Sequence, residues 1–594
     1  MKPDPKLINL MFVTGILAAT FALNASAMSG SWRFDDGYLL DYASRFSPWD
    51  YFFNPAITRG YSLNNLTPFN PLIYDLNLGL FGFSPRGFYL QHLLTLAGCG
   101  IASYFLLKIW APSLVAFLGS LCFLAGAPSL FVAQQLMVGH YIAGLLFAVI
   151  ATLAYALSLN RPERGYLLLV SVVFYMLATA CKEVYFPLPF VLVFLNQGSW
   201  RVRFTHALPM FLWSFGYLLW RTITLGSLVG GYDNGPREFS VQKALDAYLG
   251  IPELLLGRPL ISIGVVILLL ALAGYLALHR RLNLKLIIVA SLAVLLPLLP
   301  LTHFPGLSQA NRYLLLPWWL ISAFLSVAIG QMPRPGTALK SLMLIGITAL
   351  SLSQAWHVQA SLQPRLERFD AVYRFFLYAP LDRLYYSRDI KDAYYLDTVL
   401  NGARYAESRL SDRELKRRGL LVQARSLGLI DPTRYSVWSY DADCHCVTRL
   451  ANPATADTPD PEKASASLLT LSLSPPYPPL FSRLSGEMRF SAFTESSVSI
   501  EGQWQGPRHD AEYQLILIVP SKPQRYRLRI FPDSDENPLQ RITKFSLKLD
   551  YDDPLQARLA AAQACLLIRS AMTPLRLLLD GAPTQCQGLL NQEP

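Results

Sequence analysis

Two adjacent carboxylates, Asp35 and Asp36, are the residues of this chain best suited to chemistry. They follow an apolar segment, residues 9–28, which has the roughly 20 residues that a membrane-spanning helix needs. We therefore expect the pair at the membrane surface, on the side opposite the N-terminus. Two adjacent carboxylates are destabilised by mutual repulsion and by desolvation. A role as general base for an acceptor hydroxyl or amine would explain why the chain keeps them there. The alternative is a pair of solvated aspartates at the start of a loop.

The composition indicates a membrane protein. Of the 594 residues, 53% are hydrophobic and 15% are charged, and the mean hydropathy is +0.31. That charge content is low for a soluble protein. The net charge of +11 does not indicate nucleic-acid binding, because the basic residues lie in short segments between apolar runs rather than in one patch.

The fold class predicted from these apolar runs is a polytopic α-helical membrane protein with about eleven transmembrane helices and a C-terminal α/β region. The paired runs within residues 166–196 are short for a span. The expected spans are residues 9–28, 89–107, 113–132, 140–158, 166–181, 183–196, 207–225, 259–278, 286–302, 313–331 and 341–358.

Basic residues fall in alternate loops, which is the pattern of cytoplasmic loops in bacterial membrane proteins. This predicts a cytoplasmic N-terminus and a periplasmic location for everything after residue 359, in a multi-pass protein of the inner membrane. It also places Asp35-Asp36, Lys182-Glu183 and the loops 226–258 and 303–312 on one outer side. The first segment has a second interpretation, because Ala25-Ser26-Ala27 resembles a signal-peptidase site; we favour a retained helix.

The composition also predicts the domain organisation. Residues 1–359 form the transmembrane domain, whose first outer loop, 29–88, carries interfacial helices: Leu39, Tyr42, Ala43 and Phe46 share one helical face. A periplasmic helical region, 360–450, has helical spacing in 410–429, and a linker follows at 451–465. Residues 466–594 alternate as strands do and predict a small β-sandwich closed by a helix near 554–573. The expected strands are 468–473, 488–493, 497–504, 513–519, 526–531 and 545–551.

The cysteines agree with this sidedness. Three lie in predicted spans, where a thiol acts as a small apolar group, and four lie in the outer region, where an even number suits disulfides. Since Cys444 and Cys446 are close in sequence, we expect a bond from this pair to Cys565 or Cys586, or a bond between the latter two. A metal at Cys444-His445-Cys446 is not favoured, because one short pair supplies too few ligands.

Four segments together carry a resemblance to a known family. They are the acidic pair after the first helix, Pro68-Phe-Asn-Pro-Leu-Ile-Tyr-Asp-Leu, Cys181-Lys-Glu-Val-Tyr-Phe-Pro-Leu-Pro and Asn311-Arg-Tyr-Leu-Leu-Leu-Pro. In this order and on one side, they are similar to the GT-C superfamily of polyprenyl-phosphate-dependent glycosyltransferases, and most of all to its protein O-mannosyltransferase-like branch. The resemblance covers residues 10–330.

The resemblance implies roles for individual residues. Asp35 or Asp36 would be the base on the acceptor, with Asp35 slightly favoured. Lys182 and Arg312 would bind the donor phosphate, because a cation stabilises the charge that develops on the leaving group. In the alternative, Lys182 only pairs with Glu183 or a lipid headgroup and Arg312 only reaches toward the membrane surface. His303 is a further candidate for phosphate or sugar contact, and the expected pocket residues are Glu183, His140 and Tyr313.

The sequence predicts no metal site and no certain cofactor, since no carboxylate lies between Phe131 and Tyr141. The function that follows is an inverting transferase, of the hexosyl or pentosyl type, that moves a sugar from a polyprenyl-phosphate carrier at the periplasmic face. Its partners would be that donor, membrane lipids, and a glycan, lipid or protein acceptor. Two alternatives remain open: a flippase for a lipid-linked saccharide, which needs no base, and a ligase that uses a diphosphate-linked oligosaccharide.

Overall fold

The structure is a computed structural model of the whole chain, and it divides into two compact units. The first unit comprises Met1–Ser31 and Leu39–Leu366, and the second comprises Trp32–Tyr38 and Glu367–Pro594. The residues described below are 4–62, 65–161, 163–195, 197–227, 241–257, single positions between 264 and 274, 284–301, 311–332, 336–378, 383–387, 420–423, 436–449, 485–493, 497–505, 513–519, 522–528, 542–550, 564–569 and 576–578.

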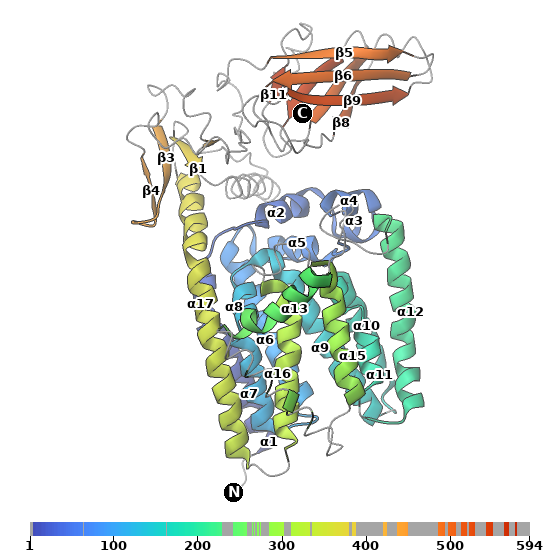
Figure 1. Cartoon of the computed structure of the whole chain (residues 1–594), viewed down its shortest axis with the longest axis vertical. Coiled ribbons are helices and arrows are strands. Elements are labelled where there is room, and N and C mark those ends of the chain that lie inside the picture. The colour runs from blue at the N-terminus through green and yellow to red at the C-terminus, as the bar shows by residue number, and fades with distance from the viewer. Residues whose placement is uncertain are drawn as a thin grey trace. The chain divides into compact units, whose positions relative to one another are not determined.

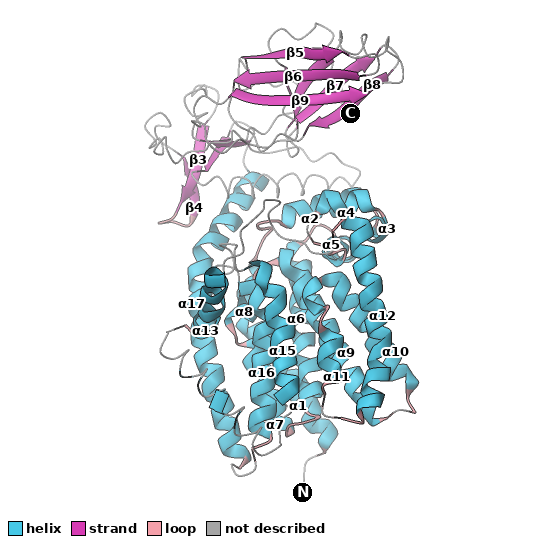
Figure 2. Cartoon of the chain, turned by 45° about the vertical axis from the view of Figure 1, so that its right-hand side comes forward, coloured by secondary structure: helices cyan, strands magenta, loops and turns pink. Residues whose placement is uncertain are grey.

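The first unit is a helical bundle, and helices and strands are distinguished by colour in Figure 2. Its helices are α1 (Pro5–Leu23), η1 (Ala25–Ser29), α2 (Asp36–Arg45, from Leu39 onward), α3 (Pro48–Phe53), α4 (Pro55–Tyr61), α5 (Phe69–Phe81), α6 (Pro85–Leu107), α7 (Ser113–Leu124), α8 (Ala127–Ala133), η2 (Leu136–Val138), α9 (Gly139–Asn160), α10 (Gly165–Cys181), η3 (Glu183–Tyr185), α11 (Leu188–Val193), α12 (Trp200–Leu225), α13 (Val241–Leu256), α15 (Leu284–Leu295), η4 (Leu296–Leu301), η5 (Asn311–Leu314), α16 (Leu315–Gly330) and α17 (Thr337–Tyr378, to Leu366).

The prediction of a polytopic helical membrane protein is confirmed. Within the described residues, five helices are long and apolar enough to cross a membrane, or six if the bent pair α7 and α8 is one span. Shorter apolar helices cover 165–181, 183–193 and 285–298. The number of eleven spans stays a prediction, because most of the expected span 259–278 lies outside the described residues. Helix α13 was expected to be loop.

The first helix packs against α6 and α7. Asn9 accepts hydrogen bonds from the Tyr104 hydroxyl and the Lys108 ammonium, both at 2.7 Å. The Phe12 ring stacks on Phe117 with centroids 4.6 Å apart. These contacts connect α1 to α6 and α7 along its length.

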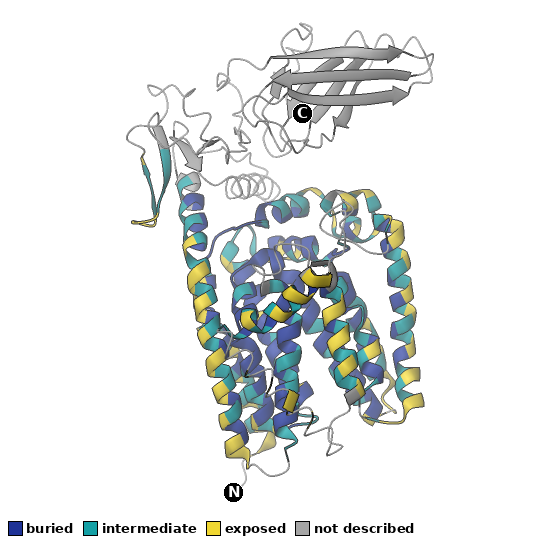
Figure 3. Ribbon diagram, in the orientation of Figure 1, coloured by how far each residue is buried: buried dark blue, intermediate teal, exposed yellow. Residues whose placement is uncertain are grey.

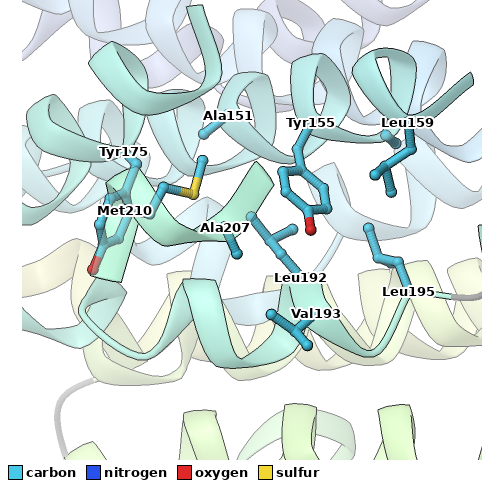
Figure 4. Packing of buried hydrophobic residues seen from close by; sticks show 10 residues of the cluster. Ala151, Tyr155, Leu159, Tyr175, Leu192, Val193, Leu195, Ala207 and Met210 are labelled. Atoms are coloured by element: carbon cyan, nitrogen blue, oxygen red, sulfur yellow. The ribbon is translucent and has the colours of Figure 1, made fainter. Parts of the chain in front are cut away.

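Tyrosine, alanine and larger aliphatic side chains fill the contact between α9, α10, α11 and α12 (Figure 4). Tyr155 and Tyr175 are fully buried there, beside Ala207 and Met210. Each tyrosine hydroxyl finds a partner: Tyr155 donates to the Arg203 carbonyl at 2.6 Å, and Tyr175 lies 2.6 Å from the Ser214 hydroxyl. Buried hydroxyls need such partners, so these bonds fix how the four helices pack.

The outer face of α12 is apolar and exposed (Figure 3). Leu212, Phe215, Leu219 and Ile223 recur at intervals of three and four residues, so they share one face of the helix. Phe215 is 72% exposed. A stripe of this kind suits contact with lipid tails rather than with water.

Short helices cover the end of the bundle opposite the N-terminus (Figure 1). Ser47 caps α3 together with Asp50, and the backbone N–H and hydroxyl of Ser47 hold the pKa of the Asp50 carboxyl below its ordinary value. Arg59 on α4 donates to the carbonyls of Ile223 and Thr224, the last turn of α12. A cation is favourable at that position, because unpaired carbonyls give a helix C-terminus a partial negative charge.

Gly126, between α7 and α8, allows Trp318 of α16 to approach the backbone. A Cβ atom there would lie 1.9 Å from Trp318 Nε1, which donates to the Phe123 carbonyl at 3.0 Å. We expect Gly126→Ala to lower the free energy of unfolding by about 1–3 kcal/mol, because the buried indole must move. Thermal unfolding in detergent measures this. Gly79→Ala is the control, since nothing lies within 4 Å of its Cβ position; equal melting temperatures for both variants would contradict the prediction.

The second unit contains three sheets. The first has the order β2-β1-β3-β4, with β1 parallel to both β2 and β3. Two antiparallel sheets, with orders β5-β6-β9 and β11-β10-β7-β8, fit the predicted sandwich strands. The strands are β1 (Arg383–Ser387), β2 (Leu420–Gln423), β3 (Ser436–Asp441), β4 (Cys446–Arg449), β5 (Ser485–Phe493), β6 (Ser497–Gln505), β7 (Tyr513–Val519), β8 (Lys522–Leu528), β9 (Ile542–Asp550), β10 (Ala564–Arg569) and β11 (Arg576–Leu578).

Two helices predicted in this unit are wrong where the structure describes them. Strand β2 lies inside the expected helix 410–429, so the region 360–450 is not simply helical. Strand β10 lies inside the expected helix 554–573, where it pairs with β7. In both places, pairing with a strand distant in sequence outweighs the local helical spacing. The expected strand 468–473 lies outside the described residues.

The expected pairing of Cys444 and Cys446 with other cysteines is also wrong. Cys444 and Cys446 are bonded to each other, across the turn between β3 and β4. His445 between them has a positive φ of 49°, which brings the flanking Cα atoms to 5.2 Å, within the range of a disulfide. Cys586 lies outside the described residues, and Cys565 is in β10. Cys99, Cys122 and Cys181 are free and buried, as expected.

Candidate functional site

Lys182 and Glu183 lie in the break between α10 and α11. Helix α10 ends at Cys181, Lys182 is extended with φ −161° and ψ 141°, and Glu183 begins the short helix η3. Pro187 and Pro189 follow at the start of α11, where proline is tolerated because the first N–H groups of a helix have no partner within it. The sequence therefore interrupts an apolar stretch just where two charged side chains stand.

The Glu183 carboxylate accepts two hydrogen bonds and has a second, longer ion pair. Arg221 Nη1 of α12 is 2.6 Å from Oε1, and the Leu66 backbone nitrogen is 2.8 Å from the same oxygen. Lys182 Nζ is farther, at 3.5 Å from Oε2. The Arg221 and Lys182 side chains are only 4% and 7% exposed. Arg221 is therefore the nearer of the two cations that pair with Glu183.

Lys182 is oriented by neutral groups. Its ammonium donates to Asn65 Oδ1 at 2.8 Å and lies 5.5 Å from the centre of the Tyr141 ring. An ammonium over an aromatic face is attracted to the ring electrons. These contacts fix the position of the ammonium.

Arg312 and Tyr313 form the opposite side of the same cluster. Arg312 lies 5.0 Å from the Tyr313 ring centre, and its Nη2 donates to the Tyr313 hydroxyl at 3.2 Å. The Tyr313 and Tyr141 rings meet edge to face with centroids 5.9 Å apart. Arg312 and Lys182 are thereby joined through two aromatic rings.

His140 completes this arrangement at the first turn of α9. Its ring lies 4.5 Å from the Tyr141 ring, and the charges of both Lys182 and Arg312 reach it. The side chain is buried, and Nδ1 has no hydrogen-bond partner among the residues that the structure describes. Such an atom is suited to a polar contact with a ligand.

The group of Lys182, Glu183, Arg221 and Arg312, called the cation cluster below, holds three cations and one carboxylate. Buried charges of one sign repel each other strongly because the surroundings screen them little. Cations gathered in such a place are suited to binding an anion. A phosphate group matches it, since guanidinium groups bind phosphate oxygens in pairs.

An apolar cavity of about 530 Å³ lies in the same unit. Val184 and Tyr185, which directly follow Glu183, line it, and so do Leu316 and Pro317, which follow Arg312 and Tyr313. Leu192 of α11 and Leu286 of α15 line it farther along. The two chain segments that carry the cation cluster therefore continue into the wall of an apolar space.

The acidic pair belongs to the second unit, where its two members differ. Asp36 is 1% exposed, and its Oδ2 accepts a hydrogen bond from the Arg33 backbone nitrogen at 2.7 Å. The Asp36 nitrogen donates to the Arg33 carbonyl at 3.0 Å, at the start of α2. Asp35 is only half-buried. The structure thus gives Asp36 a local structural task and leaves Asp35 the more accessible carboxylate.

Five residues predicted from the sequence come together in the first unit: Lys182, Glu183, Arg312, Tyr313 and His140. His303 lies outside the described residues. Sequence reasoning missed Asn65 and Arg221. Arg221 could have been found from the sequence, since an arginine inside a predicted span, 207–225, generally marks a functional or paired position. Nothing in the sequence pointed to Asn65.

Groups of three or more histidine, cysteine, aspartate or glutamate side chains that could hold a metal are absent from the described part of the chain.

Comparison with known proteins gave structural similarities only. No family model and no curated protein matches the chain. ArnT from Cupriavidus metallidurans, in a crystal structure bound to undecaprenyl phosphate, is similar at 12% identity and a TM-score of 0.41, over 75% of this chain and 99% of that one. The apo state of the same protein is similar at 12% identity and a TM-score of 0.37, over 73% and 93%.

Proposed function

We propose that this protein is an inverting glycosyltransferase that moves a sugar from a polyprenyl-phosphate carrier to an acceptor at the periplasmic face of the inner membrane. The sequence segments similar to the GT-C superfamily support the proposed reaction. The basic residues in alternate loops support its location at the periplasmic face. The acceptor is a compound with a free hydroxyl or amine: a glycan, a lipid or a protein.

The observation that carries the proposal is the continuity between the cation cluster and the apolar cavity. A polyprenyl-phosphate sugar has an anionic head and a long apolar tail. The cluster offers Lys182, Arg221 and Arg312 to the head, and the cavity beside it offers an apolar wall to the first isoprene units. A ligand that is apolar alone or anionic alone would leave one of the two unused.

The reaction then needs one base and one stabilised leaving group. The Asp35 carboxylate takes the proton of the acceptor hydroxyl or amine as that atom bonds to the anomeric carbon. Attack comes from the face opposite the phosphate, so the configuration inverts. The bond from the anomeric carbon to the phosphate oxygen breaks, and its electron pair stays on polyprenyl phosphate. Lys182 and Arg312 stabilise the charge that develops there.

The test is donor turnover by the purified protein in lipid discs, with a synthetic polyprenyl-phosphate sugar. We expect Arg312→Ala to raise the donor KM and to lower kcat together, because the phosphate loses a partner in both the ground state and the transition state. Lys182→Ala should act in the same direction. Lys285→Ala, on α15, is the matched control and should transfer sugar at the wild-type rate.

Two results would contradict the proposal. Wild-type protein that carries the donor across a vesicle membrane but never cleaves it would be a flippase. Wild-type protein that cleaves a diphosphate-linked oligosaccharide and ignores the monophosphate donor would be a ligase.

A further inference from the structure

The geometry points to Asp370, on α17, as a positioning residue for the acidic pair, acting through Arg33. This inference rests on the proposed function, because the task of the pair is the base chemistry described above. It adds Asp370 to the residues that support the acidic pair, although Asp370 lies 337 residues from Arg33 in the sequence.

Arg33 joins the two parts of this arrangement. Its Nε donates to Asp370 Oδ1 at 3.0 Å, and its Nη2 donates to Asp370 Oδ2 at 2.5 Å, so the pair is bidentate. The two side chains are 4% and 13% exposed. The backbone nitrogen of the same arginine binds the Asp36 carboxylate. One residue therefore connects α17 to the start of α2.

The next residue strengthens the connection. Phe34 has φ +48°, a left-handed conformation that is rare for a bulky side chain and costs energy unless its surroundings hold it. Its ring packs on Phe369 with centroids 4.9 Å apart, and both rings are buried. Consecutive residues of the first outer segment, Arg33 and Phe34, thus contact consecutive residues of α17.

This conformation determines where the next residue points. The backbone leaves Phe34 in an unusual direction, and Asp35 follows directly, before α2 begins at Asp36. A chain segment without the Arg33–Asp370 pair and the Phe34–Phe369 contact would relax toward ordinary φ values. Asp35 would then lose its fixed orientation, while the phosphate-binding cations of the first unit would stay in place.

The expected consequence is a loss in kcat without a change in donor KM. A base held in the wrong orientation slows proton transfer but leaves binding of the phosphate unchanged. We expect Asp370→Asn to lower kcat by about ten- to a hundredfold, on the scale of misplaced catalytic groups. Asp370→Glu keeps a carboxylate for Arg33 and should recover most of the rate.

The experiment compares these two variants with Glu367→Gln in the full-length protein in lipid discs, with rates normalised to folded protein. Glu367 lies one turn earlier on α17 and pairs with exposed His445 at 3.0 Å, so it controls for loss of a carboxylate on the same helix. A purely structural ion pair would lower the folded fraction and leave kcat per folded molecule unchanged. That result, or an equal kcat for Asp370→Asn and Glu367→Gln, would overturn the inference.

A second measurement does not depend on transfer. Carbodiimide labels accessible carboxylates, and peptide mass spectrometry locates the label. Asp36 should be protected in the wild-type protein and labelled in Asp370→Asn, with protection restored in Asp370→Glu. If wild-type protein transfers no sugar yet shows this pattern, the proposed function fails and the positioning contact stands; equal labelling in all variants would refute the contact itself.

Discussion

Replacing Asp35 with asparagine is expected to lower sugar transfer by about 10²–10⁴-fold, the range over which a positioned general base contributes. The amide has nearly the same shape as the carboxylate but cannot accept the proton of the acceptor. Because the change also removes repulsion from Asp36, the protein should stay folded and inserted. Donor KM should hardly change, since the cations that bind the phosphate are untouched. Initial rates with a purified polyprenyl-phosphate sugar measure the effect.

Asp36→Asn should behave differently from Asp35→Asn. Asparagine can still accept the hydrogen bond of the Arg33 nitrogen through its carbonyl oxygen, although a neutral acceptor binds less strongly than a carboxylate. A smaller loss than that of Asp35→Asn is therefore expected. Asp41→Asn is the control. Asp41 is another aspartate of α2, and it pairs with Arg45 one turn farther along the same helix. Wild-type turnover in both the Asp35 and Asp36 variants would show that the base lies elsewhere.

Replacing Glu183 with glutamine is expected to have the largest effect on stability. The change leaves Lys182 and Arg221 buried without their shared carboxylate, and removal of one partner from a buried pair typically lowers the free energy of unfolding by about 3–5 kcal/mol. Glu183 itself is 25% exposed, so the low end of that range applies. Thermal unfolding in detergent measures the loss.

The same variant tests the anion site. Polyprenyl phosphate supplies the missing negative charge, so it should raise the melting temperature of Glu183→Gln by more than it raises that of the wild type. Glu163→Gln, in the exposed loop after α9, is the matched control and should show the wild-type response. If the lipid phosphate stabilises the wild type and the Glu183 variant equally, the cation cluster does not bind the phosphate.

Sequence reasoning located the charged residues better than their partners. Lys182, Glu183 and Arg312 follow or precede long apolar runs, so their positions at helix ends could be predicted from hydropathy. The contact of Glu183 with Arg221 and with the Leu66 nitrogen joins segments 38 and 117 residues away. Only packing in three dimensions determines such contacts. Both ion pairs of Glu183 are present, and Arg221 is the nearer cation, so the role of Lys182 stays a prediction.

The errors in the second unit have a different physical origin. Residues 410–429 have spacing that fits a helix, yet Leu420–Gln423 within them forms β2, which pairs with β1 in parallel. Parallel pairing joins strands that are far apart in the chain, so it cannot be predicted from local periodicity. The Cys444–Cys446 bond spans a turn in which His445 has a positive φ, and hydrophobic periodicity does not predict such a turn.

Helix α12 joins the short helix α4 to the cation cluster. Its last turns hold Arg221, which binds Glu183, and the carbonyls of Ile223 and Thr224, which bind Arg59 of α4. The contacts with Glu183 and with Arg59 are therefore made by one turn of helix. The orientation of α4 and the position of the Arg221 guanidinium are for that reason not independent of each other.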